Sequence, residues 1–138
     1  MLDLNLIREK PDLVRTALKN RQMDAYASPV DDILRLDEKR RGLLTQVEAL
    51  KAERNAVSKE IGKMKDAAER EKKIAARREV GDKISALDKE VAEVEAELNN
   101  LIAGLPNIPD ERTPVGASEE ENVVLRTVGQ LPEFDFEP

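Results

Sequence analysis

The chain has 138 residues, of which 38% are charged and only 2% are aromatic, a composition that favours long solvated helices over a thick core. It contains no His and no Cys, which excludes disulfides, thiol nucleophiles, imidazole bases and ordinary zinc sites. No apolar run approaches the roughly 20 residues that cross a bilayer, and the start is unlike a signal peptide, so we expect a soluble, cytoplasmic protein without a membrane partner.

The first 21 residues predict two short helices. Asp3 can cap the first helix. Pro11, followed by Asp12, suits the first turn of the second helix, where a missing N–H costs nothing. The second helix has one apolar face and is too short to be stable alone, so we expect it to pack against the element that follows.

A much longer helical pattern begins near Ser28 and Pro29, which resemble an N-cap and a first helical residue. From there apolar residues recur every three or four positions, as in the seam of a coiled coil. Two series of them can be paired so that the residue numbers of each pair add up to 134, as expected when a chain folds back near Ala67. The outgoing series is Ile33, Leu36, Leu43, Val47 and Leu50, and the returning series is Leu101, Leu98, Val91, Leu87 and Ile84.

The pairing predicts an all-α fold: a long antiparallel two-helix coiled-coil arm with the short N-terminal helices packed at its base. We expect the long helices near residues 29–65 and 70–103, with the turn near 65–69. Gly104 is expected to end the second helix in a left-handed conformation. Residues 1–104 would therefore form one arm domain.

The predicted seam changes character with distance from the base. Beyond residue 54 nearly every pair contains a cation, as in Arg54–Val80 and Val57–Arg77. Such side chains can lay their stems along the seam and lift their charges into water. Residues 51–83 hold eleven basic and seven acidic residues, a local charge of +4, so the rest of the chain carries −10. We therefore expect the distal arm to be the least stable part and the part that attracts a polyanion.

The segment after Gly104 has a different composition. Residues 105–118 hold three prolines and no helical period, and residues 123–128 are rich in β-branched side chains, as in a strand. A lone strand is unstable, so residues 105–138 are interpreted as a linker and a first strand that needs a sheet from elsewhere. The consecutive acids at 119–121 favour a solvated loop over a metal site. Asp135 and Glu137 could suggest a pair of carboxylates for acid–base catalysis, but the sequence indicates no pocket around them, so a non-catalytic interpretation is preferred.

Several blocks, in order, resemble the amino-terminal region of bacterial-type seryl-tRNA synthetases. They are MLDLNLIREKPDLVRTALKNR, LRLDEKRRGLLTQVEALKAERNAVSKEIGKMK and LIAGLPNIPDERTPVGASEEENVVLRTVG, with EFDFEP after them. The LPNIP, PVG and EENV elements are the most specific. The tip, DAAEREKKIAA, lacks the glycine expected in the family's turn.

The resemblance implies a parent enzyme, a class II serine–tRNA ligase that charges tRNA(Ser) with serine, uses ATP and Mg²⁺ and works as a homodimer. In that family the helical arm grips the long variable arm and elbow of the tRNA. Residues 105–138 would lead into a catalytic domain of the same chain, which lies beyond Pro138. The sequence given would then have no catalytic residues, metal ligands or cofactor of its own.

The resemblance also turns the distal cations into candidate RNA-binding residues, since phosphate contacts depend on charge and reach. No aromatic residue lies between them, so base stacking is not expected. The alternative is an ordinary solvated face, balanced by pairs such as Glu69–Lys73. The candidates are Arg54, Lys59, Lys63, Lys65, Arg70, Lys73 and Arg77.

Two other functions remain open from the sequence. One is a structural coiled coil, such as an oligomerisation rod or a chaperone-like module without RNA binding. A rod should keep its seam apolar to the end, and this seam becomes cationic. The other is an isolated relative of the ligase arm that binds tRNA or another partner without a ligase.

Overall fold

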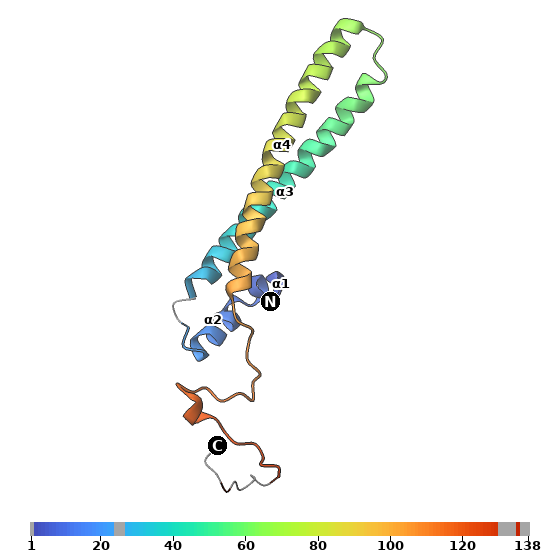
Figure 1. Cartoon of the computed structure of the whole chain (residues 1–138). Helices are drawn as coiled ribbons and strands as arrows, with labels where there is room; N and C mark the ends of the chain where they lie inside the picture. The colour runs from blue at the N-terminus through green and yellow to red at the C-terminus, as the bar shows by residue number, and fades with distance from the viewer. Residues whose placement is uncertain (1, 24–26, 130–134, 136–138) are drawn as a thin grey trace.

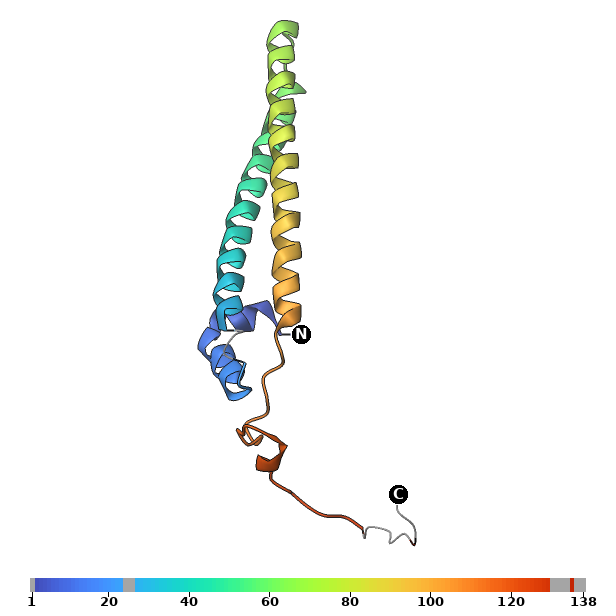
Figure 2. The same cartoon turned by 60° about the vertical axis from the view of Figure 1, so that its left-hand side comes forward.

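The computed structural model describes residues 2–23, 27–129 and 135. Two long helices form an antiparallel hairpin, and two short helices pack at its open end (Figures 1 and 2). The helices are α1 (Leu4–Glu9), α2 (Pro11–Asn20), α3 (Ala27–Ile61) and α4 (Ala67–Gly104), and a short 3₁₀ turn, η2 (Glu119–Glu121), follows. The predicted all-α arm with short helices at its base is confirmed.

The base helices begin where the sequence predicts. The Asp3 carboxylate accepts a hydrogen bond from the backbone N–H of Asn5 at 2.6 Å, and Pro11 opens α2. The end of α2 has no glycine to mark it. Gln22 adopts φ 56°, and the N–H groups of Gln22 and Met23 donate back to the carbonyl oxygens of Lys19 and Leu18 at 2.9 Å. This is a Schellman motif in which Gln occupies the usual glycine position.

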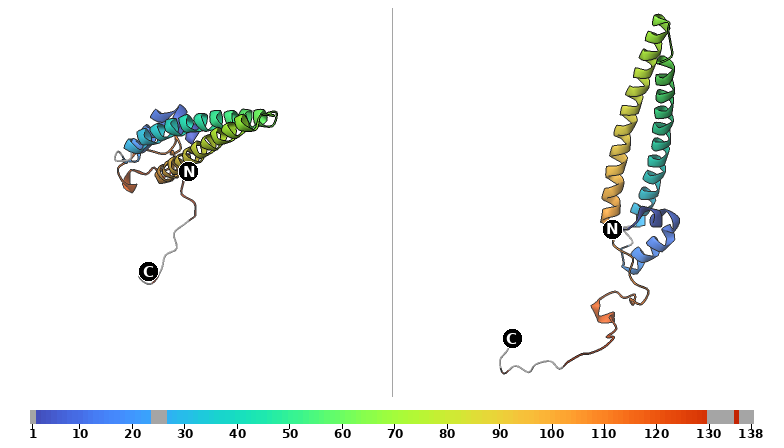
Figure 3. Two further views of the ribbon diagram at one scale, coloured as in Figure 1. Left: turned by 90° about the horizontal axis from the view of Figure 1, so that it is seen from above. Right: turned by 90° about the vertical axis from the view of Figure 1, so that its right-hand side faces the viewer.

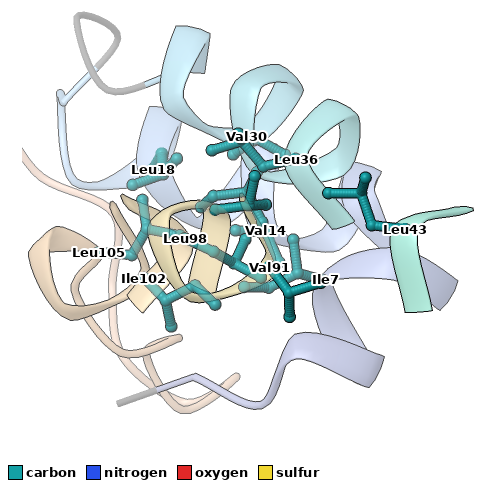
Figure 4. Packing of buried hydrophobic residues seen from close by; sticks show 12 residues of the cluster. Ile7, Val14, Leu18, Val30, Leu36, Leu43, Val91, Leu98, Ile102 and Leu105 are labelled. Carbon is teal, nitrogen blue, oxygen red and sulfur yellow. The ribbon is translucent and has the colours of Figure 1, made fainter. Parts of the chain in front are cut away.

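All four helices contribute to one hydrophobic core at the base of the arm (Figure 4). Its members come from the apolar face of α2, from α1 and from the proximal seam of α3 and α4. Leu105, the residue after α4, is buried there as well. Because α1 and α2 pack over the open end of the hairpin, they shield the apolar residues between α3 and α4 from water there. The core residues are Ile7, Val14, Leu18, Val30, Ile33, Leu36, Leu43, Val91, Val94, Leu98, Ile102 and Leu105.

One charged side chain is buried in the described part of the chain. Asp37 is only 1% exposed, and its Oδ2 lies 3.6 Å from Nη1 of Arg8 in α1 and 3.1 Å from Nε of Arg41. Its Oδ1 has no hydrogen-bond partner. Burying a carboxylate is costly unless cations compensate it. Arg41 donates a hydrogen bond to Asp37, and the charge of Arg8 adds an electrostatic contact between α1 and α3. The seam pattern gave no sign of this residue.

The seam becomes more open with distance from the base, as predicted. The seam positions Leu43, Val47 and Ile84 are buried, whereas Arg54 and Val80 are half-buried. The predicted seam residues Arg70 and Arg77 are exposed. Ile61, 8% exposed, is the one buried position beyond Val47 in the described part of α3. The helices remain side by side to the tip (Figures 1 and 3), but little apolar surface is hidden between them there.

The ends of the long helices differ from the expected ones. The N-terminus of α3 is Ala27, so Ser28 lies inside the helix and is not the N-cap. The connection spans residues 62–66 rather than 65–69, because α3 ends before Gly62, a poor helix former, and Asp66 caps α4. The Asp66 carboxylate accepts from the N–H of Glu69 at 2.9 Å. We call residues 62–66 the tip.

The prediction of a left-handed Gly104 was wrong. Gly104 is the last residue of α4, and Gly129 is the glycine with a positive φ in the described chain. The helix ends because Leu105 precedes Pro106, whose ring disfavours the helical region, and Leu105 accordingly has φ −79° and ψ 132°.

The strand-like segment forms no strand in the described structure. Its side chains are among the most exposed apolar groups, with Leu125 93% and Val128 81% exposed. Since a strand needs a neighbour for its hydrogen bonds, the segment stays irregular. Of the final block EFDFEP, all but Asp135 lies outside the described residues.

Three ion pairs join α3 to α4, and two of them support the predicted register. Arg40 contacts Glu95 at 2.7 Å, Lys51 contacts Asp88 at 3.4 Å, and Lys73 pairs with Glu60. In the first and last of these pairs, the two residue numbers add up to within one of the predicted 134. Near the tip, the hydrogen bond from Lys73, and secondarily its charge, lowers the pKa of Glu60 below 4.5.

The uneven seam predicts uneven costs of truncation. Leu98→Ala, in the base core, should lower the free energy of unfolding by about 2–4 kcal/mol because a cavity forms in a packed site. Val80→Ala, at a half-buried distal position, should cost about 1 kcal/mol or less. Chemical denaturation followed by circular dichroism measures both values. Equal costs would contradict the gradient.

The Glu60–Lys73 pair predicts a specific titration. With Lys73 replaced by Met, the pKa of Glu60 should rise towards 4.5, as measured by NMR of the side-chain carboxyl carbon. Because the folded pKa is depressed, the contribution of the pair is complete above the unfolded pKa and is lost as pH falls through the folded value. Lys72→Met is the matched control and should leave Glu60 unchanged. An unchanged Glu60 in Lys73→Met would show that the two side chains do not pair in solution.

Candidate nucleic-acid interface

The predicted RNA-binding residues lie on three consecutive parts of the distal arm. Arg54 and Lys59 belong to α3, Lys63 and Lys65 to the tip, and the other three to α4. Lys59, Lys63, Lys65, Arg70 and Arg77 are exposed, and none of these five forms an ion pair within the described chain. The structure therefore presents them to solvent as free charges.

Lys73 differs from the other candidates because its ammonium is engaged with Glu60 across the helix pair. A phosphate would have to compete with a carboxylate that already accepts a hydrogen bond. The sequence suggested another partner, Glu69, four residues before Lys73 on the same helix; the structure pairs Lys73 across the hairpin instead. We therefore assign Lys73 first to the packing of the distal arm.

Some of the cations near the tip also complement the helix ends. Lys59 lies in the last turn of α3 and Lys63 just beyond it, where the helix carries a partial negative charge. Asp66 and Glu69 occupy the opposite, positive end of α4. This arrangement stabilises the helix ends by a few tenths of a kcal/mol per charge and leaves the outer ends of the lysine side chains in water.

The structure brings Arg54 and Arg77 together at a shallow groove of about 580 Å³ between the two helices. A third arginine, Arg78, lines the same groove and was not among the sequence candidates. The heptad pattern assigned Arg77 to the seam, and Arg78 was counted only as one of the basic residues of the distal arm; the groove geometry singles it out. We call this the arginine groove; its lining is Arg54, Ser58, Ile74, Arg77, Arg78, Gly81, Asp82 and Ser85.

A larger cleft, of about 890 Å³, lies at the base between α2 and residues 108–116. Its apolar wall includes Leu13, and its polar side includes Asp110 and Arg112. Hydrogen bonds from the Arg112 side chain, and then from its backbone, lower the pKa of Asp110 below 3.8. This carboxyl group therefore stays ionised at neutral pH and is poorly suited to donate a proton.

The remaining chemistry of the described residues is limited. No group of three Asp or Glu side chains in residues 2–23, 27–129 and 135 gathers closely enough to hold a metal ion. The acids at 119–121 lie in η2, and Glu121 instead accepts a hydrogen bond from the N–H of Ala117 at 2.8 Å. In the same part of the chain, no helix combines the length and apolarity needed to cross a bilayer.

Comparison with known proteins gives consistent results. Over 99% of its length the chain is 53% identical to a serine–tRNA ligase of Thermomicrobium roseum, and over its whole length 51% identical to that of Roseiflexus castenholzii. The fold matches a crystal structure of seryl-tRNA synthetase from Pyrococcus horikoshii complexed with ATP, with a TM-score of 0.83 and 38% identity over 89% of this chain.

The chain corresponds to only part of these relatives. It spans 30% and 32% of the two ligases and 28% of the Pyrococcus structure. Residues 1–109 match the family described as the seryl-tRNA synthetase N-terminal domain. This match covers both base helices, the whole arm and the first residues of the linker. The chain therefore belongs to the seryl-tRNA synthetase N-terminal domain family.

Proposed function

We propose that this chain is the tRNA-binding arm of a serine–tRNA ligase, which recognises the long variable arm and elbow of tRNA(Ser) through backbone contacts. The observation that carries the proposal is the set of exposed, unpaired cations on the distal arm of a member of this family. A rod of two helices can follow an RNA backbone, and structured RNA is recognised mainly by shape and phosphates.

The proposed parent enzyme rests on the similarity to serine–tRNA ligases, which are about three times as long as this chain. In this proposal it is a class II, homodimeric, cytoplasmic ligase that charges tRNA(Ser) with serine, using ATP and Mg²⁺. Because the chain spans only about a third of these relatives, we assign serine activation to a further domain of the same protein, with which the exposed segment 123–128 would pair.

The distribution of charge argues against a purely structural coiled coil. An oligomerisation rod gains stability from an apolar seam along its whole length. Here Arg70 and Arg77 occupy seam positions and are exposed to solvent. These positions weaken the packing of the helix pair and raise the positive potential of the distal arm, as expected of a surface that binds an anion.

The proposal predicts binding of the 138-residue chain to a tRNA(Ser) transcript with a long variable arm. Changing the exposed cations Lys63, Lys65 and Arg70 to Glu should weaken binding at least about tenfold at 0.1 M salt. The log–log salt slope should fall by about 0.9 for each lost phosphate contact. Fluorescence anisotropy across a salt series measures both quantities.

The matched control reverses three exposed cations at the base, Lys10, Lys19 and Arg21. Arg15 is unsuitable for this purpose because it pairs with Asp12 and Asp31. Equal weakening by the two triple variants would mean that general charge attracts the RNA. Equal binding of a transcript whose variable arm has been shortened would mean that the arm does not recognise this feature.

A further inference from the structure

We propose that the arginine groove is a discrete phosphodiester-binding subsite, separate from the cations of the tip, in which Arg54, Arg77 and Arg78 hold the RNA backbone between the two helices. The inference rests on the proposed function and specifies where on the arm a phosphate is held. It also assigns a role to Arg78, which was not among the RNA-binding candidates from the sequence.

The shape of the groove follows from helical spacing. Arg54 and Ser58 are four residues apart and form a ridge on α3, while Ile74, Arg78 and Asp82 form a facing ridge on α4. Gly81 also lines the groove, and a Cβ built there would meet no atom within 4 Å, so the groove is open to solvent on the α4 side.

The charge in the groove is available to a ligand. Arg54, Arg77 and Arg78 form no ion pair within the described chain, although Asp82 is one helical turn from Arg78. Three guanidinium groups against one carboxylate leave an excess of positive charge. The hydroxyl of Ser58 donates to the carbonyl oxygen of Arg54 at 2.7 Å, which leaves the Ser85 hydroxyl as a further donor to an anion.

The chemistry of these residues suits a phosphate of an RNA backbone. Guanidinium groups are planar donors that bind phosphate oxygens in pairs, unlike the point charge of lysine. No aromatic side chain lines the groove, so a base has nothing to stack on. Ile74, 44% exposed, offers an apolar surface that suits the carbon atoms of a ribose.

The groove also differs from the tip in the backbone that carries its side chains. The tip is a five-residue connection, so its lysines are attached to irregular backbone. The groove residues lie on two regular helices, below the Glu60–Lys73 pair that joins these helices. A phosphate bound there contacts arginines of both α3 and α4. It therefore links the two helices at a level of the arm where little apolar packing joins them.

The decisive variant is R54Q/R77Q/R78Q in the 138-residue chain, compared with K39Q/K83Q/K89Q. Both remove one charge from α3 and two from α4, but the control residues are exposed and lie outside the groove. We expect the groove variant to bind the long-variable-arm tRNA(Ser) transcript about tenfold more weakly and the control variant about twofold more weakly. The salt slope should fall by two to three units in the groove variant and by less than one in the control.

A second measurement shows whether the loss is local. Phosphate-ethylation interference should identify phosphates whose modification blocks binding to the wild-type chain. One or two neighbouring phosphates should lose this effect in the groove variant and keep it in the control variant and in K63Q/K65Q. The variant R54K/R77K/R78K retains the charge but not the planar donors, and should bind about threefold more weakly than the wild type.

The outcomes separate the two proposals. If the wild type does not distinguish the transcript from one with a shortened variable arm, the proposed function fails. If the wild type makes that distinction but the groove and control variants weaken equally, or the lysine variant binds like the wild type, the groove inference alone fails. Far-ultraviolet circular dichroism should show equal helicity in all variants, and thermal melts compare their stability.

Discussion

Two isolated helices can bury only one narrow stripe of side chains against each other, and the rest of this molecule depends on that constraint. Such a stripe gives little stability per residue, so the hairpin needs a third layer somewhere. The chain provides it at one end only, where α1 and α2 close over the proximal seam and Leu105 completes the core. Stability is therefore concentrated at the base, and the far end is left to marginal packing.

This distribution makes the distal arm available for another purpose. A seam that does not have to be sealed can hold arginine in place of leucine, because the long side chain covers apolar surface while its charge remains in water. Arg54 is half-buried in this way, whereas Arg77 is fully exposed. The arginines at seam positions thus weaken the packing of the helix pair and at the same time create a positive surface on an otherwise acidic chain.

The sequence was sufficient to predict the hairpin and its register, because heptad spacing reflects burial directly and the 134 pairing uses many residues at once. Helix ends were less predictable, since they depend on single residues in competition. Helix α4 ends at Gly104 because Pro106 restricts the backbone of Leu105. After α2, the backbone of Gln22 adopts the left-handed conformation that a glycine usually takes. The burial of Asp37 and the place of Arg78 in the groove depend on how the helices pack together, for which one-dimensional periodicity has no signature.

The contact between Asp37 and Arg8 has a consequence for the aim of the arm. With 35 residues at about 1.5 Å each, α3 is about 52 Å long and acts as a lever pivoted at the base. A tilt of about 5° at the pivot would displace the far end by about 4–5 Å, more than the length of a hydrogen bond. Apolar packing alone tolerates such sliding, whereas a carboxylate held 3.6 Å from a guanidinium on α1 resists it. The contact between Asp37 and Arg8 therefore adds to the apolar core in fixing the angle of α3 at the base, and so the position of the far end.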